Sequence, residues 1–353
     1  CEAVATLKSQ PVAAVELMDR ASIRSVENKA GMPDYFKTLP ETAAALLVET
    51  RAMDAAKLAA QVEVISAALT ATPTLLPFKF TDRPEEFTQL WAIRQGLFPS
   101  VGSARATGTT VIIEDVAVPV PQLAAMTLDL QRLFDKHGYT GSIIFGHALE
   151  GNLHFVITPN FANPAETERY KNFMDDVCQM IVQQYDGSLK AEHGTGRNIA
   201  PFVELEWGQQ AYQLMRDIKA LFDPQNLLNP GVILNDDPEA HLKNIKPMAA
   251  VDPLVDKCIE CGFCEPNCPS RALTLSPRQR IVGLREMARL RAVGEDASRL
   301  QQLADAYEYQ GIDTCAADSL CSLTCPVGIN TGAMMLKKRE ERRGALSRWV
   351  GNR

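Results

Sequence analysis

The distribution of cysteine is the feature of this sequence that most restricts its fold. Seven of the nine cysteines lie between positions 258 and 325, and residues 1–257 contain only Cys1 and Cys178. A disulfide framework would spread its cysteines through a small secreted domain. No charged segment followed by an apolar stretch, as in a secretion signal, opens the chain. Clustered thiols without such a signal indicate metal ligands in a reducing compartment, so we expect a cytoplasmic protein.

The first run of cysteines has the spacing C-x2-C-x2-C-x3-C-P and contains Cys258, Cys261, Cys264 and Cys268. This spacing wraps the backbone around a cubane, so that three thiolates reach three irons of one cluster. In two-cluster ferredoxins the fourth cysteine binds the other cluster. A zinc knuckle can use C-x2-C pairs, but zinc needs four ligands and has no use for this run followed by proline. The run therefore predicts iron–sulfur clusters.

The second run contains Cys315, Cys321 and Cys325, and Asp318 stands where alignment with the first run would place a cysteine. Exchange of the fourth ligands gives cluster one Cys258, Cys261, Cys264 and Cys325, and cluster two Cys268, Cys315 and Cys321. Cluster two then has Asp318, or no protein ligand, on its fourth iron. An oxygen-ligated iron should be labile, so this cluster is expected to be 4Fe-4S or 3Fe-4S. The alternative is that Asp318 is solvated and another group completes the site.

The rest of the chain alternates between apolar, strand-like segments and amphipathic segments with helical spacing. We expect strands at about 44–48, 74–80, 109–113, 141–147 and 153–158, and helices at about 52–69, 84–97, 121–137, 164–185 and 201–221. The last two strands form a hairpin, which favours an α+β fold with a mixed or antiparallel sheet and helices on one face. A proline-rich linker follows, and the cysteine region reads as all-helical.

Composition and charge exclude several classes of protein. With 353 residues, of which 46% are hydrophobic, the chain is long enough for two or three domains with a sizeable core. A formal charge of −7 makes nucleic acid an unsuitable partner. No stretch of about 18 apolar residues is present, so we expect no membrane span.

The first half carries a second group of metal-ligand residue types. His147 and His154 flank a glycine turn, and in a hairpin such positions face each other. Glu192 and His193 follow in another glycine-rich turn. Two imidazoles and one carboxylate suit zinc, iron or manganese and leave positions open for water or substrate. The alternative is that each histidine is an ordinary core residue; His137 and His241 we assign to surface or helix-end positions.

Three motifs in this half resemble a known family. The segment from His147 to His154 resembles the H-x-G-D-G-N-x-H element of FAD-linked oxidases of the vanillyl-alcohol-oxidase type, with Leu149 and Glu150 as departures. The segments 192–196 and 222–231 resemble their E-H-G-x-G and F-D-P-x-x-x-L-N-P-G elements. Together with the cysteine region, the chain resembles the middle of the large bacterial flavin and iron–sulfur D-2-hydroxyacid dehydrogenases.

The resemblance implies a domain organisation. It implies a ferredoxin-like antiparallel sheet with helices, the C-terminal (cap) domain of the oxidases, over residues 1–234. A linker at 235–257, a small all-α two-cluster ferredoxin domain at 258–335 and a basic tail at 336–353 would follow. The resemblance also implies an N-terminal FAD domain and a C-terminal redox domain, which we expect outside this chain; the start at Cys1 and not at Met is what a piece of a longer polypeptide would show. This segment alone is then expected to bind FAD poorly, with Asn229 touching the flavin, and to be inactive.

The resemblance also implies a reaction. A D-2-hydroxyacid, with D-2-hydroxyglutarate favoured over D-lactate, is oxidised to the 2-oxoacid, and electrons pass from FAD through the clusters to a downstream acceptor. A divalent ion, expected to be zinc, on His147, His154 and Glu192 lowers the pKa of the substrate hydroxyl. His193 is the expected general base. The candidates for binding substrate carboxylates are Asn152, Arg94, Arg105 and Arg197, because guanidinium offers a bidentate fork.

Two other functions remain open from the residues alone. One is a metal-dependent hydrolase fused to a redox module, and the other is a non-catalytic electron-transfer subunit. The basic tail, residues 336–353, has apolar positions on one face if it is helical. Such a helix can make peripheral contact with an inner membrane face or pack on a downstream domain, and we favour the second.

Overall fold

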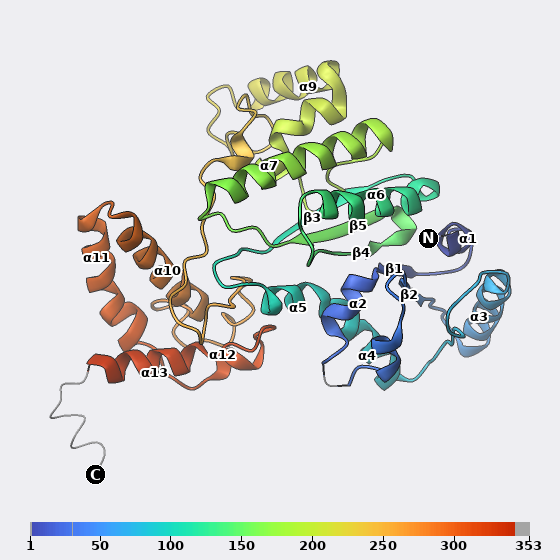
Figure 1. Ribbon diagram of the computed structural model, residues 1–353, viewed down its shortest axis with the longest axis horizontal. Helices are drawn as coiled ribbons and strands as arrows, with labels where there is room; N and C mark the ends of the chain where they lie inside the picture. The colour runs from blue at the N-terminus through green and yellow to red at the C-terminus, as the bar shows by residue number, and fades with distance from the viewer. Residues whose placement is uncertain (1, 30, 343–353) are drawn as a thin grey trace, which may run out of the picture. The chain divides into compact units, whose positions relative to one another are not determined.

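The computed structural model describes residues 2–29 and 31–342, and the chain divides into two compact units (Figure 1). The first unit consists of Cys1–Phe98, Ile112–Pro159 and Pro164–Ile245. The second unit combines Lys246–Arg353 with two short segments from the first half of the sequence, Pro99–Val111 and Asn160–Asn163.

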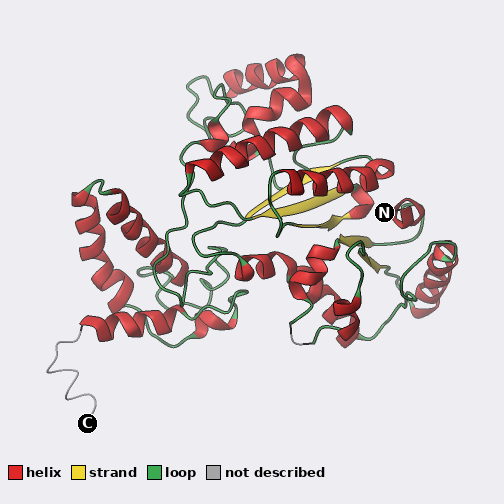
Figure 2. Cartoon of the chain, in the orientation of Figure 1, coloured by secondary structure: helices red, strands yellow, loops and turns green. Residues whose placement is uncertain are grey.

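A five-stranded sheet forms the centre of the first unit within the described residues (Figure 2). In spatial order its strands are β2 (Ala45–Glu49), β1 (Ala14–Met18), β4 (Ile143–His147), β5 (Asn152–Ile157) and β3 (Ile112–Ala117). Every neighbouring pair is antiparallel. This confirms the expected α+β fold, and the expected hairpin joins β4 to β5.

Helices α6 (Leu123–Lys136) and α7 (Pro164–Gln179) pack on one face of this sheet. The ring of Phe155 on β5 has its centroid 6.1 Å from that of Phe134 on α6 and 5.8 Å from that of Phe173 on α7. Side chains alternate between the two faces along a strand, so His154 points to the opposite face.

The strand register brings polar residues together on that opposite face. His154 is paired with Asp115 of β3 on one side and with Phe145 of β4 on the other, and His147 is paired with Glu16 of β1. Directly opposed residues of antiparallel strands share a face. Four strands therefore contribute to one patch on the side of the sheet that α6 and α7 leave uncovered.

The structure corrects three details of the expected strands. Residues 74–80 are irregular, because Pro73 and Pro77 cannot donate ladder hydrogen bonds and the apolar side chains between 75 and 78 are exposed. The third strand runs over Ile112–Ala117 and not 109–113, which places Asp115 inside it. Strand β1 is not predicted, because the charged residue Glu16 interrupts its apolar run.

Helices complete the first unit and connect it to the second. The expected helices within 52–69, 84–97, 121–137, 164–185 and 201–221 are confirmed, whereas α2 is not predicted. The bounds are α1 (Glu2–Leu7), α2 (Arg20–Val26), α3 (Ala55–Leu69), α4 (Pro84–Gln95), α5 (Leu97–Ala104), α8 (Gly196–Ile199) and α9 (Val203–Phe222).

The described part of the second unit is helical and lacks strands, as expected. Its helices are α10 (Pro277–Val293), α11 (Ala297–Tyr307), α12 (Leu320–Leu323) and α13 (Thr331–Arg342). Ser276 and Gln279 form a reciprocal capping box at the start of α10, and Pro277 occupies its first turn. The basic tail begins within α13, and its residues 343–353 lie outside the described residues. Among the described helices we find none with the length and apolarity that crossing a bilayer requires.

Gly151 in the β4–β5 turn provides a test of the hairpin. We expect Gly151→Ala to lower the free energy of unfolding by more than the ~1–2 kcal/mol that a left-handed residue costs. Gly151 has φ = 64°, and an added Cβ would lie 1.9 Å from the Val118 carbonyl oxygen. Denaturant unfolding measures the loss. Gly141→Ala is the control, because its Cβ would meet nothing within 4 Å; equal losses in the two variants would contradict this account.

Candidate functional site

The predicted metal ligands converge in the structure. The Glu192 Oε1 atom lies 3.1 Å from His147 Nε2 and 3.0 Å from His154 Nε2. The histidines come from the end of β4 and the middle of β5, and Glu192 comes from the loop that precedes α8. The three ligand atoms lie within 4.8 Å of one another. The spacing on either side of the hairpin turn therefore does bring these three residues together.

Glu16, which the sequence analysis missed, orients His147. Its Oε1 lies 2.6 Å from His147 Nδ1, and its Oε2 accepts a hydrogen bond of 2.6 Å from Arg94 Nε. The hydrogen bond between His147 Nδ1 and Glu16 Oε1 raises the pKa of His147. A carboxylate on one ring nitrogen leaves the other directed at a metal, as is usual for metal-binding histidine. A lone glutamate within the apolar strand β1 was the signal available in the sequence.

His154 is held in the neutral form that a metal ligand requires. Burial, together with the neighbouring His193, His147 and Arg94, lowers the pKa of His154 to about 4. The ring stacks on His193 at a centroid distance of 4.8 Å. At neutral pH the His154 ring is therefore uncharged, which is the state in which imidazole binds metal.

Asp115 is the second residue that the sequence analysis missed, and it supports the loop that carries Glu192 and His193. It is fully buried, and its Oδ2 accepts hydrogen bonds from the backbone N–H groups of Ala191 (2.9 Å) and Glu192 (2.7 Å). Burial alone would raise its pKa, but these N–H groups, Lys190 and His193 outweigh burial and lower it. Its Oδ1 lies 3.4 Å from His193 Nδ1. Acidic residues at 114 and 115 inside an otherwise apolar strand were the available signal.

The donor set fits a divalent metal. Asp115, His154 and His193 form a second trio whose ligand atoms lie within 4.8 Å of one another, and it shares His154 with the first trio. The Oδ1 of Asp115 and the Nδ1 of His154 are buried without a hydrogen-bond partner in the described residues. Nitrogen and oxygen donors of this kind suit zinc or manganese.

The structure distributes the four predicted substrate-binding residues among different environments. Arg94 lies at the patch of polar residues on the uncovered face of the sheet. Its guanidinium carbon is 4.5 Å from the centroid of the Phe145 ring. Arg197 is exposed on α8, close to the loop that carries Glu192. Asn152 is buried and donates from Nδ2 to Asp115 Oδ2 over 3.2 Å, so it supports Asp115.

Arg105 is a correction to the sequence analysis. It belongs to the second unit, where its Nε and Nη atoms donate to the backbone carbonyls of Gly102, Thr109, Asp256, Lys257 and Cys258. A guanidinium has five N–H groups, and five carbonyls accept from this one. It has no donor left for a substrate carboxylate, so we do not retain it as a substrate-binding residue.

The motif at 222–231 forms a capped turn after α9. The Asp223 carboxylate accepts from the backbone N–H groups of Leu227 (2.9 Å) and Leu228 (2.8 Å), and with Lys219 these hydrogen bonds lower its pKa to about 2. Asn229 follows with a left-handed backbone, φ = 44°. The aspartate thus fixes the position of Asn229, the predicted flavin contact.

His137 and His241 lie apart from the metal ligands. His137 ends α6, as expected, and contacts Asp176 at 2.6 Å. His241, expected near the surface, is buried against the ring of Phe202 at 5.2 Å. The surrounding segment looks like a linker in sequence because it is proline-rich, but the first unit covers this side chain.

The cysteines of the second unit fall into two groups. Burial, followed by the nearby thiols of Cys258 and Cys325, raises the pKa of Cys264 to about 12. Cys325, from the second run, is among the thiols that raise the pKa of both Cys258 and Cys264, whereas Cys321 is a smaller cause for Cys264, so Cys325 is grouped with the first run. A separate cavity is lined by Cys268, Cys315, Cys321 and Asp318. Thiols such as Cys258 and Cys264, whose pKa values burial raises, need a metal to be held as thiolates, so the first group fits iron. The second group fits iron by its donors, because three thiols and one carboxylate line a single cavity.

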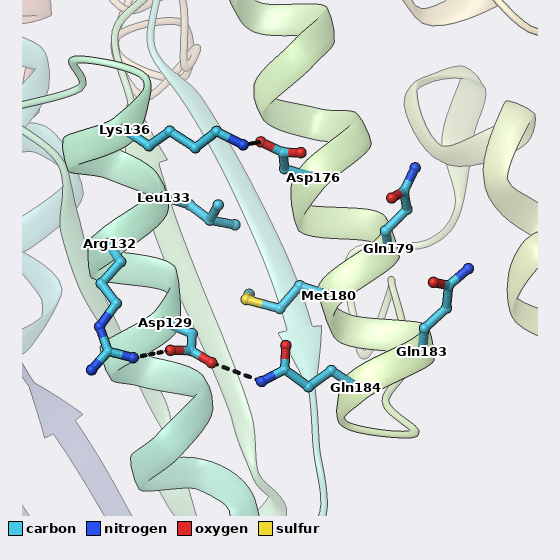
Figure 3. Close-up of a pocket in the computed structure, with 9 residues that line it drawn as sticks. All are labelled: Asp129, Arg132, Leu133, Lys136, Asp176, Gln179, Met180, Gln183 and Gln184. Atoms are coloured by element: carbon cyan, nitrogen blue, oxygen red, sulfur yellow. Dashed lines mark hydrogen bonds and ion pairs between the residues drawn. The ribbon is translucent and has the colours of Figure 1, made fainter.

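A larger polar cavity lies between α6 and the segment that follows α7 (Figure 3). Its charged side chains point at one another: Asp129 pairs with Arg132 and accepts from Gln184 over 2.9 Å, and Lys136 lies 2.7 Å from Asp176. The predicted site residues do not line it. We assign this cavity no role in the function.

Comparison with known proteins decides the family. A family described as "FAD linked oxidases, C-terminal domain" matches residues 1–233. The chain belongs to this family. A second family model, a 4Fe-4S dicluster domain, matches residues 254–329. Both matches confirm the resemblance found in the sequence, and they support FAD and iron–sulfur clusters as the cofactors.

Three relatives illustrate the range of similar proteins. D-2-hydroxyglutarate dehydrogenase of Pantoea ananatis is 27% identical over 345 residues, covering 81% of this chain and 34% of that protein. The mitochondrial D-lactate dehydrogenase (cytochrome) of Arabidopsis thaliana is 30% identical, covering 66% of this chain and 39% of that protein. Glycolate oxidase subunit GlcD of Bacillus subtilis is 33% identical, covering 36% and 27%. The chain thus spans well under half the length of these relatives.

Proposed function

We propose that this chain provides the metal site and the electron relay of an FAD-dependent dehydrogenase that oxidises a D-2-hydroxyacid to the 2-oxoacid. The convergence of the His147, His154 and Glu192 ligand atoms beside His193 is the observation that carries the proposal. The family supplies the flavin chemistry, and the second unit supplies two groups of thiols that fit clusters.

The protein groups have distinct roles in this proposal. His147, His154 and Glu192 hold a divalent ion, with zinc favoured, and when bound the ion lowers the pKa of a substrate hydroxyl. Asp115 orients His193, whose Nδ1 lies 3.4 Å from Asp115 Oδ1. A proton held on Nδ1, facing this carboxylate, leaves Nε2 unprotonated. That nitrogen is the general base, because a neutral imidazole can take a proton near neutral pH.

The substrate is proposed to be D-2-hydroxyglutarate in preference to D-lactate. The relative with that printed name matches 81% of this chain, whereas the D-lactate dehydrogenase matches 66%. D-2-hydroxyglutarate has a second carboxylate, which needs a second cation to pair with it. Arg94 and Arg197, which both belong to the first unit, are the candidates. Arg197 is exposed and available for that role, and Asn152 holds Asp115 in place.

The electrons leave through the second unit in this proposal. Asn229 would contact FAD, which a flavin-binding domain beyond this chain would mainly hold, and the flavin would supply the hydride acceptor for the substrate. Cys258, Cys261, Cys264 and Cys325 ligate the first 4Fe-4S cluster, and Cys268, Cys315, Cys321 and Asp318 ligate the second, as 4Fe-4S or 3Fe-4S. Clusters transfer single electrons, so a downstream acceptor takes them one at a time.

Flavin reduction tests this function in the FAD-loaded enzyme. We expect bleaching of the flavin by D-2-hydroxyglutarate and weaker bleaching by D-lactate, with no response to the L-isomers. Reduction by none of the D-2-hydroxyacids, together with ester or amide hydrolysis, would favour a metal hydrolase. Absence of a bound divalent ion and unchanged turnover in His193→Ala would favour a non-catalytic electron-transfer subunit.

A further inference from the structure

Two arginines of α10 are buried in the second unit, and they differ in how their charge is neutralised. Arg285 is 2% exposed and pairs with Glu260, whose Oε1 lies 2.6 Å from its Nη1. Arg280 is 1% exposed, and none of its partners in the described part of the chain is a carboxylate. A buried guanidinium is costly unless an anion accompanies it. The buried charge of Arg280 therefore requires an anion other than a protein carboxylate.

The contacts of Arg280 point to that anion. Its Nε donates to the Gly311 carbonyl over 2.6 Å, which fixes the side chain. Its Nη1 donates to Cys268 Sγ over 3.7 Å, and its Nη2 donates to Ser270 Oγ over 2.8 Å. Arg280 also lines the cavity that holds Cys268, Cys315 and Cys321. A cluster ligated by these thiolates would supply the missing negative charge.

Ser270 adds a second donor to the same sulfur. Its Oγ lies 3.2 Å from Cys268 Sγ. When Cys268 is a thiolate it can only accept. The Leu275 carbonyl oxygen, at 3.4 Å, is a second acceptor for the Ser270 hydroxyl, but the sulfur is nearer and charged, so the single hydroxyl proton goes to the sulfur and the oxygen accepts from Arg280. Guanidinium and hydroxyl thus both donate to one cluster ligand. In the first group, Cys258 Sγ accepts from the backbone N–H of Glu260 over 3.3 Å, and Glu260 balances the nearby Arg285.

We propose that Arg280 and Ser270 are positioning residues that raise the midpoint potential of the second cluster by donating hydrogen bonds to Cys268. One-electron reduction adds a negative charge to the cluster, and a buried cation with two donors at one sulfur stabilises the reduced form more than the oxidised form. This inference rests on the cluster assignment of the proposed function.

Redox titration followed by electron paramagnetic resonance tests the inference on the full-length protein. Cys261→Ser first identifies the signal of the first cluster. In Arg280→Gln we expect the ratio of reduced to oxidised second cluster to fall about tenfold at a fixed ambient potential, equivalent to ~59 mV for one electron. Ser270→Ala, which keeps the charge, is expected to shift the same signal in the same direction by less.

Arg291→Gln is the matched control, because Arg291 is an exposed residue of the same helix. It should leave both signals unchanged. Wild-type potentials for the second cluster in Arg280→Gln and Ser270→Ala, or a shift confined to the first cluster, would overturn the proposal. If the Arg280→Gln protein does not bind its clusters, the potential of the second cluster in Ser270→Ala decides the test alone. Iron and sulfide content of the unmodified protein tests the cluster assignment separately, so the two failures are distinguishable.

Discussion

Glu192→Gln is expected to lose the divalent ion and, in the FAD-loaded enzyme, the oxidation of D-2-hydroxyacids. Glu192 Oε1 faces both Nε2 atoms at 3.0–3.1 Å, and an amide oxygen in its place carries no charge to offset a divalent cation. Loss of an outer partner of a metal ligand already costs ~10–100-fold in affinity, so loss of a ligand itself should cost at least ~100-fold. Metal analysis after dialysis, with turnover measured on the same sample, tests this expectation.

Variants of two other carboxylates provide an intermediate loss of metal affinity and a control. Glu16→Gln removes the acceptor behind His147, and we expect metal affinity to fall by ~10–100-fold, as for other outer partners. Glu150→Gln is the control, because this carboxylate is 73% exposed in the same hairpin and pairs with Lys8 at the surface. Full metal content in Glu192→Gln, or equal losses in all three variants, would contradict the proposed site.

The proximity of the two histidines of the proposed metal site could be predicted because the information is local, whereas Glu192 stands 38 residues after His154 and was proposed from its glycine-rich turn. His147 and His154 flank one turn, and a hairpin makes positions on either side of its turn neighbours. Glu16 and Asp115 could not be found in this way. Each reaches the site through strand pairing with a partner 131 or 39 residues away, His147 or His154. Register of that kind depends on the order of strands in the sheet, which β1 determines and which periodicity did not reveal.

Arg105 shows the opposite error. It stands just before a strand of the first unit in sequence, which favoured a place beside the substrate. Its segment, Pro99–Val111, instead belongs to the second unit, where the guanidinium binds the carbonyls of Asp256, Lys257 and Cys258. The local sequence does not distinguish an arginine that binds five carbonyls from one that binds a carboxylate. Both roles need only a buried planar donor.

Cys325→Ser is expected to remove the first cluster, although Cys325 belongs to the second run of cysteines. Its thiol is among the groups that raise the pKa of Cys264 and of Cys258, which places it with the first run. Conversely, Cys268→Ser should remove the second cluster, because Cys268 lines the cavity with Cys315 and Cys321. Each variant should retain about half of the iron, since each cluster is built separately once the fourth ligands are exchanged.

Iron analysis and electron paramagnetic resonance on the reduced protein distinguish this exchange from the alternative. If each run held its own cluster, Cys325→Ser would remove the signal that depends on Cys315, and Cys268→Ser the signal that depends on Cys258. Cys178→Ser is the control: this cysteine is buried in α7 of the first unit, and its loss should leave the iron content unchanged. If the fourth ligands are exchanged in this way, each cluster takes thiolates from both runs, so neither run can bind its full cluster alone.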